Sequence, residues 1–126
     1  MSGYDILIDT NICIYLLNGD GVLGDLLQDE TIFISTITEI ELYAFSGNDA
    51  DSLIALNSFI KSVNIINFDE TIKENTIIIK RASKLKLPDC MIAATAITNK
   101  MLFITSDKAF KFVKDLNLYL YDSMRK

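Results

Sequence analysis

The chain has 126 residues and a mass of 14.2 kDa, a length typical of one domain. Half of its residues are hydrophobic and 23% are charged, a composition that excludes disordered and collagen-like proteins. Its apolar runs are far shorter than the roughly 20 residues of a membrane span, and it starts without the basic and apolar stretches of a secretory signal. Two cysteines, Cys13 and Cys90, are too few for a disulfide framework. We therefore expect a cytoplasmic protein with free thiols and no membrane contact.

The formal net charge is −5, and the charges are distributed unevenly along the chain. Residues 1–70 contain twelve acidic residues and one basic residue, Lys61, whereas residues 71–126 contain five acidic and eleven basic residues. Two interpretations remain open: solvated helix faces, or an acidic site beside a basic rim. The chain has no histidine, which excludes a Ser-His-Asp or Cys-His nucleophile system.

Strand-like and helix-like periodicity alternate along the whole chain without internal repeats. The predicted elements, in chain order, are a strand at 4–8, helices at 12–17 and 22–28, a strand at 31–34, helices at 35–45 and 49–63, a strand at 64–68, a helix from 69 or 71 to about 84, a helix at 89–98 opened by Pro88, a strand at 101–105, a helix at 108–116 and a strand at 118–121. This alternation predicts a single α/β domain, with a parallel sheet covered by helices on both faces.

Three acidic residues lie where α/β proteins commonly place ligand sites. Asp9 follows the first predicted strand and Asp107 follows the fourth, so both are expected at the carboxyl edge of the sheet. Asp89 lies in the first turn of the alanine-rich helix, among apolar neighbours. Each of the three also fits a structural role, because a carboxylate at a helix N-terminus satisfies free N–H groups and interacts favourably with the helix dipole.

Glu41 is more difficult to explain by a structural role. Its predicted helix carries an apolar stripe formed by Ile37, Ile40, Ala44 and Phe45. Glu41 falls within this stripe, and a carboxylate that faces a core must find a partner or take up a proton. Since Lys61 is the only basic residue in the first seventy, a local ion pair is not expected, and pairing with the distant Arg81 or Lys84 is the structural alternative.

If these four carboxylates converge, their mutual repulsion calls for a cation. Mg²⁺ and Mn²⁺ favour oxygen ligands, and such a site needs no histidine. The metal acidifies a bound water molecule and polarises a phosphoryl oxygen, while a free carboxylate receives the proton. The carboxylates in question are Asp9, Glu41, Asp89 and Asp107.

Four short segments carry these acids in distinctive local settings. They are Asp9-Thr10-Asn11, Thr38-Glu39-Ile40-Glu41-Leu42, Pro88-Asp89-Cys90-Met91-Ile92-Ala93-Ala94 and Thr105-Ser106-Asp107-Lys108-Ala109-Phe110. In this order and at this chain length, they resemble the four motif blocks of PIN domains, and most closely those of the stand-alone VapC-type toxins of bacterial toxin–antitoxin pairs. The resemblance covers the whole chain.

The resemblance implies a three-layer α/β/α fold and a Mg²⁺- or Mn²⁺-dependent endoribonuclease that cleaves single-stranded RNA. It implies a metal site and catalytic centre formed by Asp9, Glu41, Asp89 and Asp107. It also implies that the carboxylates are steadied by the polar side chains of Thr10, Asn11 and Thr105. Ser106 occupies a position that is often basic or polar in the family. Stand-alone members usually dimerise, and an antitoxin peptide lies across a helical groove near the site, whose walls here would be the helices at 35–45 and 49–63.

The basic second half of the chain has a use in this interpretation, because RNA binding needs cations on the phosphates and flexible single strands suit readout. The candidate residues share helix faces and are Lys80, Arg81 and Lys84 on one helix, and Lys108, Lys111 and Lys114 on another. A solvated polar face is the alternative for each of them.

Two other functions remain open. One is a catalytically inactive PIN-fold module that binds without cleaving RNA. The other is a phosphoacceptor receiver domain, which has a similar length and sheet but needs paired acids after its first strand. Here Asp9 is followed by Thr10 and Asn11, which disfavours the receiver.

Overall fold

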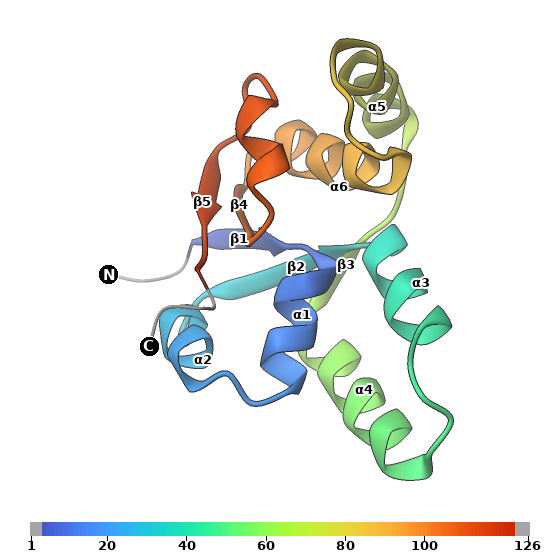
Figure 1. Cartoon of the computed structure of the whole chain (residues 1–126), viewed down its shortest axis with the longest axis vertical. Helices are drawn as coiled ribbons and strands as arrows, with labels where there is room; N and C mark the ends of the chain where they lie inside the picture. The colour runs from blue at the N-terminus through green and yellow to red at the C-terminus, as the bar shows by residue number, and fades with distance from the viewer. Residues whose placement is uncertain (1–3, 123–126) are drawn as a thin grey trace.

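The protein, described by a computed structural model for residues 4–122, is a five-stranded parallel sheet with helices on both faces (Figure 1). The strands are β1 (Asp5–Ile8), β2 (Thr31–Ser35), β3 (Asn64–Ile66), β4 (Leu102–Thr105) and β5 (Leu118–Leu120). Their order across the sheet is β3-β2-β1-β4-β5. This arrangement confirms the predicted α/β/α architecture. It differs from the 2-1-3-4-5 order of receiver domains and therefore excludes that alternative.

The helices begin where the sequence offers a polar cap. They are α1 (Thr10–Leu17), α2 (Gly21–Leu27), α3 (Thr36–Ala44), α4 (Ala50–Ser62), α5 (Glu70–Ala82), α6 (Leu87–Thr98) and the 3₁₀ helix η1 (Lys108–Phe112). Side chains that cap the first five are those of Asp9, Asp20, Ser35, Asp49 and Asp69. Pro88 lies in the first turn of α6. Within residues 4–122, none of the helices has both the length and the apolar composition of a bilayer span.

Alternate residues of the central strands face two separate cores. Leu7 of β1 and Phe103 of β4 pack against α5 and α6, whereas Ile8 and Ile104 pack against α1, α2 and α4. Figure 1 shows the same layers, with α5 and α6 on one face of the sheet and α1, α2 and α4 on the other. Because both faces are covered, the carboxyl edge of the sheet is where the strands open to solvent.

The predicted helix at 108–116 is wrong in length and type. Only Lys108–Phe112 is helical, as a short 3₁₀ turn, and Lys114 lies beyond it. Asp115 adopts a positive φ of 68°, a conformation that ends a right-handed helix. The turn brings β5 alongside β4, where the N–H of Phe103 donates to the carbonyl of Asn117 at 2.8 Å. The predicted strand at 64–68 also ends early, at Ile66, whose carbonyl accepts a hydrogen bond from the Thr36 hydroxyl at 3.1 Å, and Asp69 then caps α5.

Candidate active site

The ends of β1 and β4 are joined through one buried hydroxyl. β1 and β4 are neighbours in the sheet, with Ile8 opposite Ile104. Asp9 and Thr105 are the next residues after this pair, so both lie at the carboxyl edge of the sheet. The Thr105 hydroxyl donates to Oδ2 of Asp9 and accepts the N–H of Asp107 at 3.1 Å. Oδ1 of Asp9 accepts the N–H of Ile12 at 3.0 Å and so caps α1. Asp9 therefore has both a capping role and a fixed place at the sheet edge.

Burial governs the electrostatics of Asp9, which is only 5% exposed. The pKa of the carboxyl is raised from 3.8 to about 6, mainly by burial and to a smaller extent by the negative charges of Asp89 and Asp107. The hydrogen bonds from Thr105 and Ile12 act in the opposite direction without cancelling the effect of burial. A carboxylate at this position is therefore poorly compensated by the protein alone.

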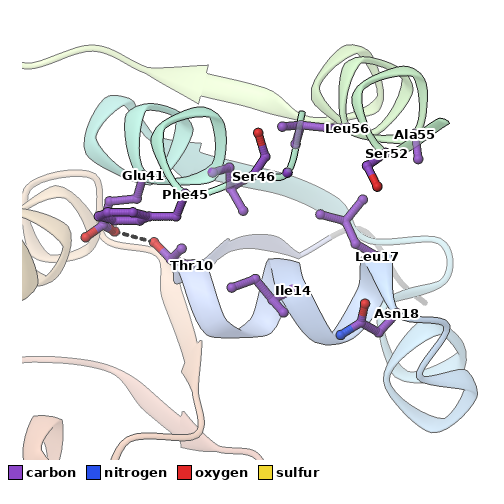
Figure 2. Close-up of a pocket in the computed structure, with 12 residues that line it drawn as sticks. Thr10, Ile14, Leu17, Asn18, Glu41, Phe45, Ser46, Ser52, Ala55 and Leu56 are labelled. Carbon is purple, nitrogen blue, oxygen red and sulfur yellow. Dashed lines mark hydrogen bonds between the residues drawn. The ribbon is translucent and has the colours of Figure 1, made fainter. Parts of the chain in front are cut away.

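Glu41 comes from α3 and is half-buried. The Thr10 hydroxyl donates to its Oε1 at 2.5 Å (Figure 2). The same hydroxyl lies 3.2 Å from that of Thr38. Within residues 4–122, Glu41 forms no salt bridge with Arg81 or Lys84, so the structural alternative is not supported. Glu41 is held by a neutral donor of α1.

The predicted core-facing stripe of this helix is wrong. Ile40 is 54% exposed and Phe45 is 81% exposed, whereas the buried residues of α3 are Thr38 and Leu42. Ile37 alone of the predicted stripe packs against a core cluster, and the side of α3 that enters a core carries Leu42 instead of Ile40 and Phe45. Glu41 is directed toward the sheet edge and not into a core.

Asp89 lies in the first turn of α6 and is half-buried. Burial raises its pKa, and the charges of Asp107 and Glu41 add to the effect, whereas Lys86 opposes it. Asp107 caps η1, where its Oδ1 accepts the N–H of Ala109 at 2.9 Å. Since Asp9 and Asp89 each respond to Asp107, the acids act on one another electrostatically.

One cavity of about 350 Å³ collects side chains from four parts of the chain. Its lining residues are Asp9, Thr10, Asn11, Ile14, Glu41, Phe45, Lys86, Pro88, Asp89, Ile92 and Asp107. The structure thus brings all four candidate carboxylates, together with Thr10 and Asn11, to a single acidic cavity. Thr105 lies behind the lining and acts through Asp9 and Asp107.

The donor chemistry of this acidic cavity fits a hard divalent cation. Four carboxylates and neighbouring hydroxyls offer only oxygen, which Mg²⁺ and Mn²⁺ prefer. Within residues 4–122, no three acidic or cysteine side chains stand close enough to form a ready-made coordination shell. Burial raises the pKa of Asp9 and Asp89, and the charges of neighbouring acids add a smaller contribution, so the carboxylates are not neutralised by the described part of the protein.

The other predicted residues lie outside the cavity lining. The Ser106 hydroxyl is 3.3 Å from that of Tyr15, so it is engaged with α1. The Lys80 ammonium donates to the Leu85 carbonyl at 2.7 Å. Within the described part of the chain, the cavity lining includes none of the predicted RNA-binding residues Lys80, Arg81, Lys84, Lys108 and Lys111. Their role in RNA binding stays a prediction.

Lys86 and Phe45 line the acidic cavity and were not among the predicted site residues. Both carry a signal in their spacing. Phe45 follows Glu41 by four residues on the same helix, and Lys86 precedes Asp89 by three at the start of α6, so each lies on the same helical side as a candidate acid.

A second cavity of about 330 Å³ lies next to the first, between α1, α3 and α4. Figure 2 shows Ile14 and Leu17 of α1 on one side and Leu56 of α4 on the other. The predicted groove walls, α3 and α4, are therefore joined by a third wall, α1. Both cavities share the lining residues Thr10, Ile14, Glu41 and Phe45.

Comparison with known proteins gives one family and a consistent set of structures. A family model described as PIN domain matches residues 6–116. No curated protein matches the sequence. A chain in the crystal structure of VapBC2 from Rickettsia felis bound to a DNA fragment from their promoter is 26% identical, with a TM-score of 0.81 over 94% of this chain and 99% of that chain.

Two further solved structures give similar values. A chain of a toxin–antitoxin complex from Klebsiella pneumoniae is 28% identical, with a TM-score of 0.72 over 88% of this chain and 94% of that chain. A chain of VapBC-1 from nontypeable Haemophilus influenzae is 26% identical, with a TM-score of 0.76 over 92% of this chain and 97% of that chain. Each likeness extends over nearly the full length of both chains.

Proposed function

Because the chain belongs to the PIN domain family, we propose that it is a divalent-metal-dependent endoribonuclease that hydrolyses single-stranded RNA, and the toxin of a VapC-type toxin–antitoxin pair. The observation that carries this proposal is the acidic cavity. Four separate parts of the fold bring Asp9, Glu41, Asp89 and Asp107 to it, and Lys86 is the one cationic side chain in its lining among the described residues. Negative charge gathered in this way is unfavourable for the fold alone and suits a cation-binding site.

The four carboxylates would hold Mg²⁺ or Mn²⁺, and the bound ion supplies Lewis acidity that polarises a phosphoryl oxygen and lowers the pKa of water. Asp9 is fixed by Ile12 and Thr105, so it provides the rigid side of the site. Thr10, the residue after Asp9, donates a hydrogen bond to Glu41 of α3 and so holds the second carboxylate. A carboxylate that is not engaged with the ion would accept the proton of the attacking water.

We further propose a cognate antitoxin as protein partner, since the solved relative from Klebsiella pneumoniae is a toxin–antitoxin complex. The 330 Å³ cavity between α1, α3 and α4 is the place where an antitoxin segment would bind, because its lining includes Ile14, Leu17 and Leu56. A homodimer completes the proposal and follows from the family resemblance alone.

The decisive experiment is cleavage of end-labelled single-stranded and double-stranded RNA by purified protein in Mg²⁺, in Mn²⁺ and in EDTA. We expect metal-dependent cleavage of the single strand. Asp107→Asn keeps an oxygen that caps η1 but removes a ligand charge, so it should abolish cleavage, whereas the matched variant of an exposed acid outside the cavity, Asp115→Asn, should be fully active.

Two results would contradict the nuclease assignment. One is an unchanged rate for Asp107→Asn, which would point to a contaminating nuclease. The other is an intact RNA substrate in both metals. RNA binding without any cleavage would instead favour the inactive PIN-fold binding module.

A further inference from the structure

Phe45 occupies an unusual place for an aromatic ring. It is the C-cap residue of α3 and is 81% exposed. It lines both the acidic cavity and the neighbouring 330 Å³ cavity between α1, α3 and α4. Phe103 and Phe110, by contrast, are buried in the core and pack edge to face. Figure 2 shows Phe45 at the end of the groove where Glu41 and Thr10 lie. Its ring therefore contributes little to the core and stands beside the candidate metal ligands.

Lys86 is the second feature of this rim. It is exposed, lies immediately before α6 and belongs to the lining of the acidic cavity, together with Asp89 three residues later. Its ammonium group is the one cationic group in that lining among the described residues. A polyanion that approaches four carboxylates is repelled, and a cation at the rim offsets that repulsion and attracts a phosphate. Lys61, on α4, is also exposed but does not belong to the cavity lining.

We infer that Lys86 and Phe45 form a nucleotide subsite at the rim of the acidic cavity, in which Lys86 binds a phosphate of single-stranded RNA and Phe45 stacks on an adjacent base. The inference rests on the proposed function and names how the substrate is held. An ammonium group and an exposed ring in the lining of one cavity match the alternation of phosphate and base along a single strand. Every base has a π-face, so this subsite orients the strand without selecting a sequence.

The first test measures equilibrium binding of a short fluorescein-labelled single-stranded RNA by anisotropy in Ca²⁺, over a series of salt concentrations. Phe45→Ala should weaken binding roughly 5- to 100-fold, the usual effect of removing one stacking platform. Lys86→Gln should weaken binding and reduce the slope of log K against log salt by about 0.7, the value for one phosphate contact on a single strand.

Two matched controls separate the subsite from general surface effects. Phe112 is 84% exposed on η1 and does not line the acidic cavity, so Phe112→Ala should bind RNA like the wild type. Lys61 is exposed on α4 and outside the cavity lining, so Lys61→Gln removes the same charge and should leave the salt slope unchanged. Equal effects at Lys61 and Lys86, or at Phe112 and Phe45, would overturn the inference in favour of diffuse binding.

A second test reports stacking directly. The chain has no tryptophan, so Phe45→Trp introduces a single fluorophore at the rim. Single-stranded RNA should quench its emission, and RNA whose bases are replaced by abasic residues should not, whereas Phe112→Trp should respond to neither. If RNA leaves the emission of Phe45→Trp unchanged, Phe45 does not stack on a base and the inference is overturned.

The outcomes distinguish this inference from the proposed function. If the wild type cleaves RNA while Phe45→Ala and Lys86→Gln keep its kcat and KM, the subsite is wrong and the nuclease stands. If RNA quenches Phe45→Trp and Lys86→Gln reduces the salt slope, but the wild type does not cleave RNA, the subsite is supported and the nuclease assignment is wrong. A wild-type protein that neither binds nor cleaves RNA overturns both. A raised KM with a smaller change in kcat is the expected result for Phe45→Ala.

Discussion

The hydrogen bonds of Asp9 and its burial shift the pKa of its carboxyl in opposite directions. As the cap of α1 and the acceptor for Thr105 it is stabilised when ionised, but its burial favours the neutral form and prevails. The pKa of about 6 lies above the ordinary 3.8, so the folded state holds a proton more tightly than the unfolded chain. The free energy of unfolding contributed by Asp9 therefore falls as pH rises from about 4 to 6, by at most about 3 kcal/mol.

Asp9→Asn should consequently stabilise the metal-free protein at pH 7.5, by less than this maximum because asparagine offers a single oxygen to two donors. The advantage should shrink toward pH 4, where the wild-type carboxyl is neutral. Thermal unfolding in EDTA across this pH range measures it. Asp49→Asn is the matched control, because Asp49 also caps a helix but its hydrogen bonds with Ser52 lower its pKa, so loss of that charge should not stabilise. A lower melting temperature for Asp9→Asn at both ends of the range would contradict the argument.

Glu41 tests the assignment as a metal ligand. Glu41→Gln keeps an oxygen that accepts from Thr10 and removes the negative charge, so the fold in EDTA should be equally or more stable. The same change should weaken Mn²⁺ binding and reduce RNA cleavage sharply. The control, Glu39→Gln, alters the same helix outside the cavity lining and should change neither. Lower stability in EDTA with a normal response to Mn²⁺ would assign Glu41 a structural role.

At the residue scale, strand ends and local motifs locate the acids but not their surroundings. Asp9 and Asp107 follow from the strand pattern, because parallel strands end at one edge. Glu41 was singled out through a predicted apolar stripe in which Ile40, Ala44 and Phe45 prove to be exposed, so that reason was wrong even though Glu41 does line the acidic cavity. Lys86 and Phe45 lie at helical spacing from Asp89 and Glu41, but their place in one common cavity depends on how α3 and α6 meet, which no local pattern encodes.

At the scale of elements, the site depends on the junction of β1 with β4. The Thr105 hydroxyl is fully buried and both donates to Asp9 and accepts from the backbone of Asp107. One side chain thus positions a carboxylate at the end of β1 and the backbone that precedes η1. The junction joins two strands that are distant in sequence but adjacent in the sheet.

Thr105→Val has nearly the same shape and removes both hydrogen bonds. It should destabilise the fold by about 1–3 kcal/mol, because the partly buried N–H of Asp107 loses its acceptor and the buried Asp9 carboxylate loses one of its two donors. The pKa of Asp9 should rise further, since the Thr105 hydrogen bond lowers it. Chemical denaturation measures the first effect, and the pH dependence of stability measures the second.

Thr95→Val is the control for this change. Thr95 is equally buried, but its hydroxyl donates to the Met91 carbonyl within α6, so its loss leaves no charged group unpaired. We expect a smaller effect on stability and no change in pH dependence. Equal effects at both threonines would remove the special role of the β1–β4 junction.

The elements themselves were largely predictable, because caps and periodicity determine them locally. Helices α4 and α5 begin after the aspartates that cap them, and Pro88 marks the start of α6. The error at η1 has a non-local cause: the apolar spacing from Lys108 onward suits a longer helix, but pairing of β5 with β4 ends it at Phe112. Tertiary pairing overrides local propensity at this point.

At the scale of the whole molecule, the carboxylates of the acidic cavity oppose the fold that positions them. The protein gains stability elsewhere, through two cores on opposite faces of one sheet. A cation that binds the folded state alone would relieve the repulsion and raise the free energy of unfolding by mass action.

Mn²⁺ should therefore raise the melting temperature of the wild type. At one hundred times its Kd the gain at 25 °C would be about 2.7 kcal/mol. The shift should be smaller in Asp107→Asn, while Asp115→Asn should respond like the wild type. Differential scanning calorimetry at increasing Mn²⁺ checks this, and the same shift in all three proteins would locate the ion elsewhere.

The position of β4 next to β1 also has a consequence for synthesis. The bond between Thr105 and Asp9 spans 96 residues, and Asp107 is the last of the four acids to be made. While β4 is still within the ribosome, Asp9 lacks the hydrogen bond from Thr105, and the acidic cavity lacks Asp107. Under the proposed function, a growing or prematurely terminated chain is harmless to the cell that makes it, and the capacity to cut RNA arises only when translation of the domain is almost finished.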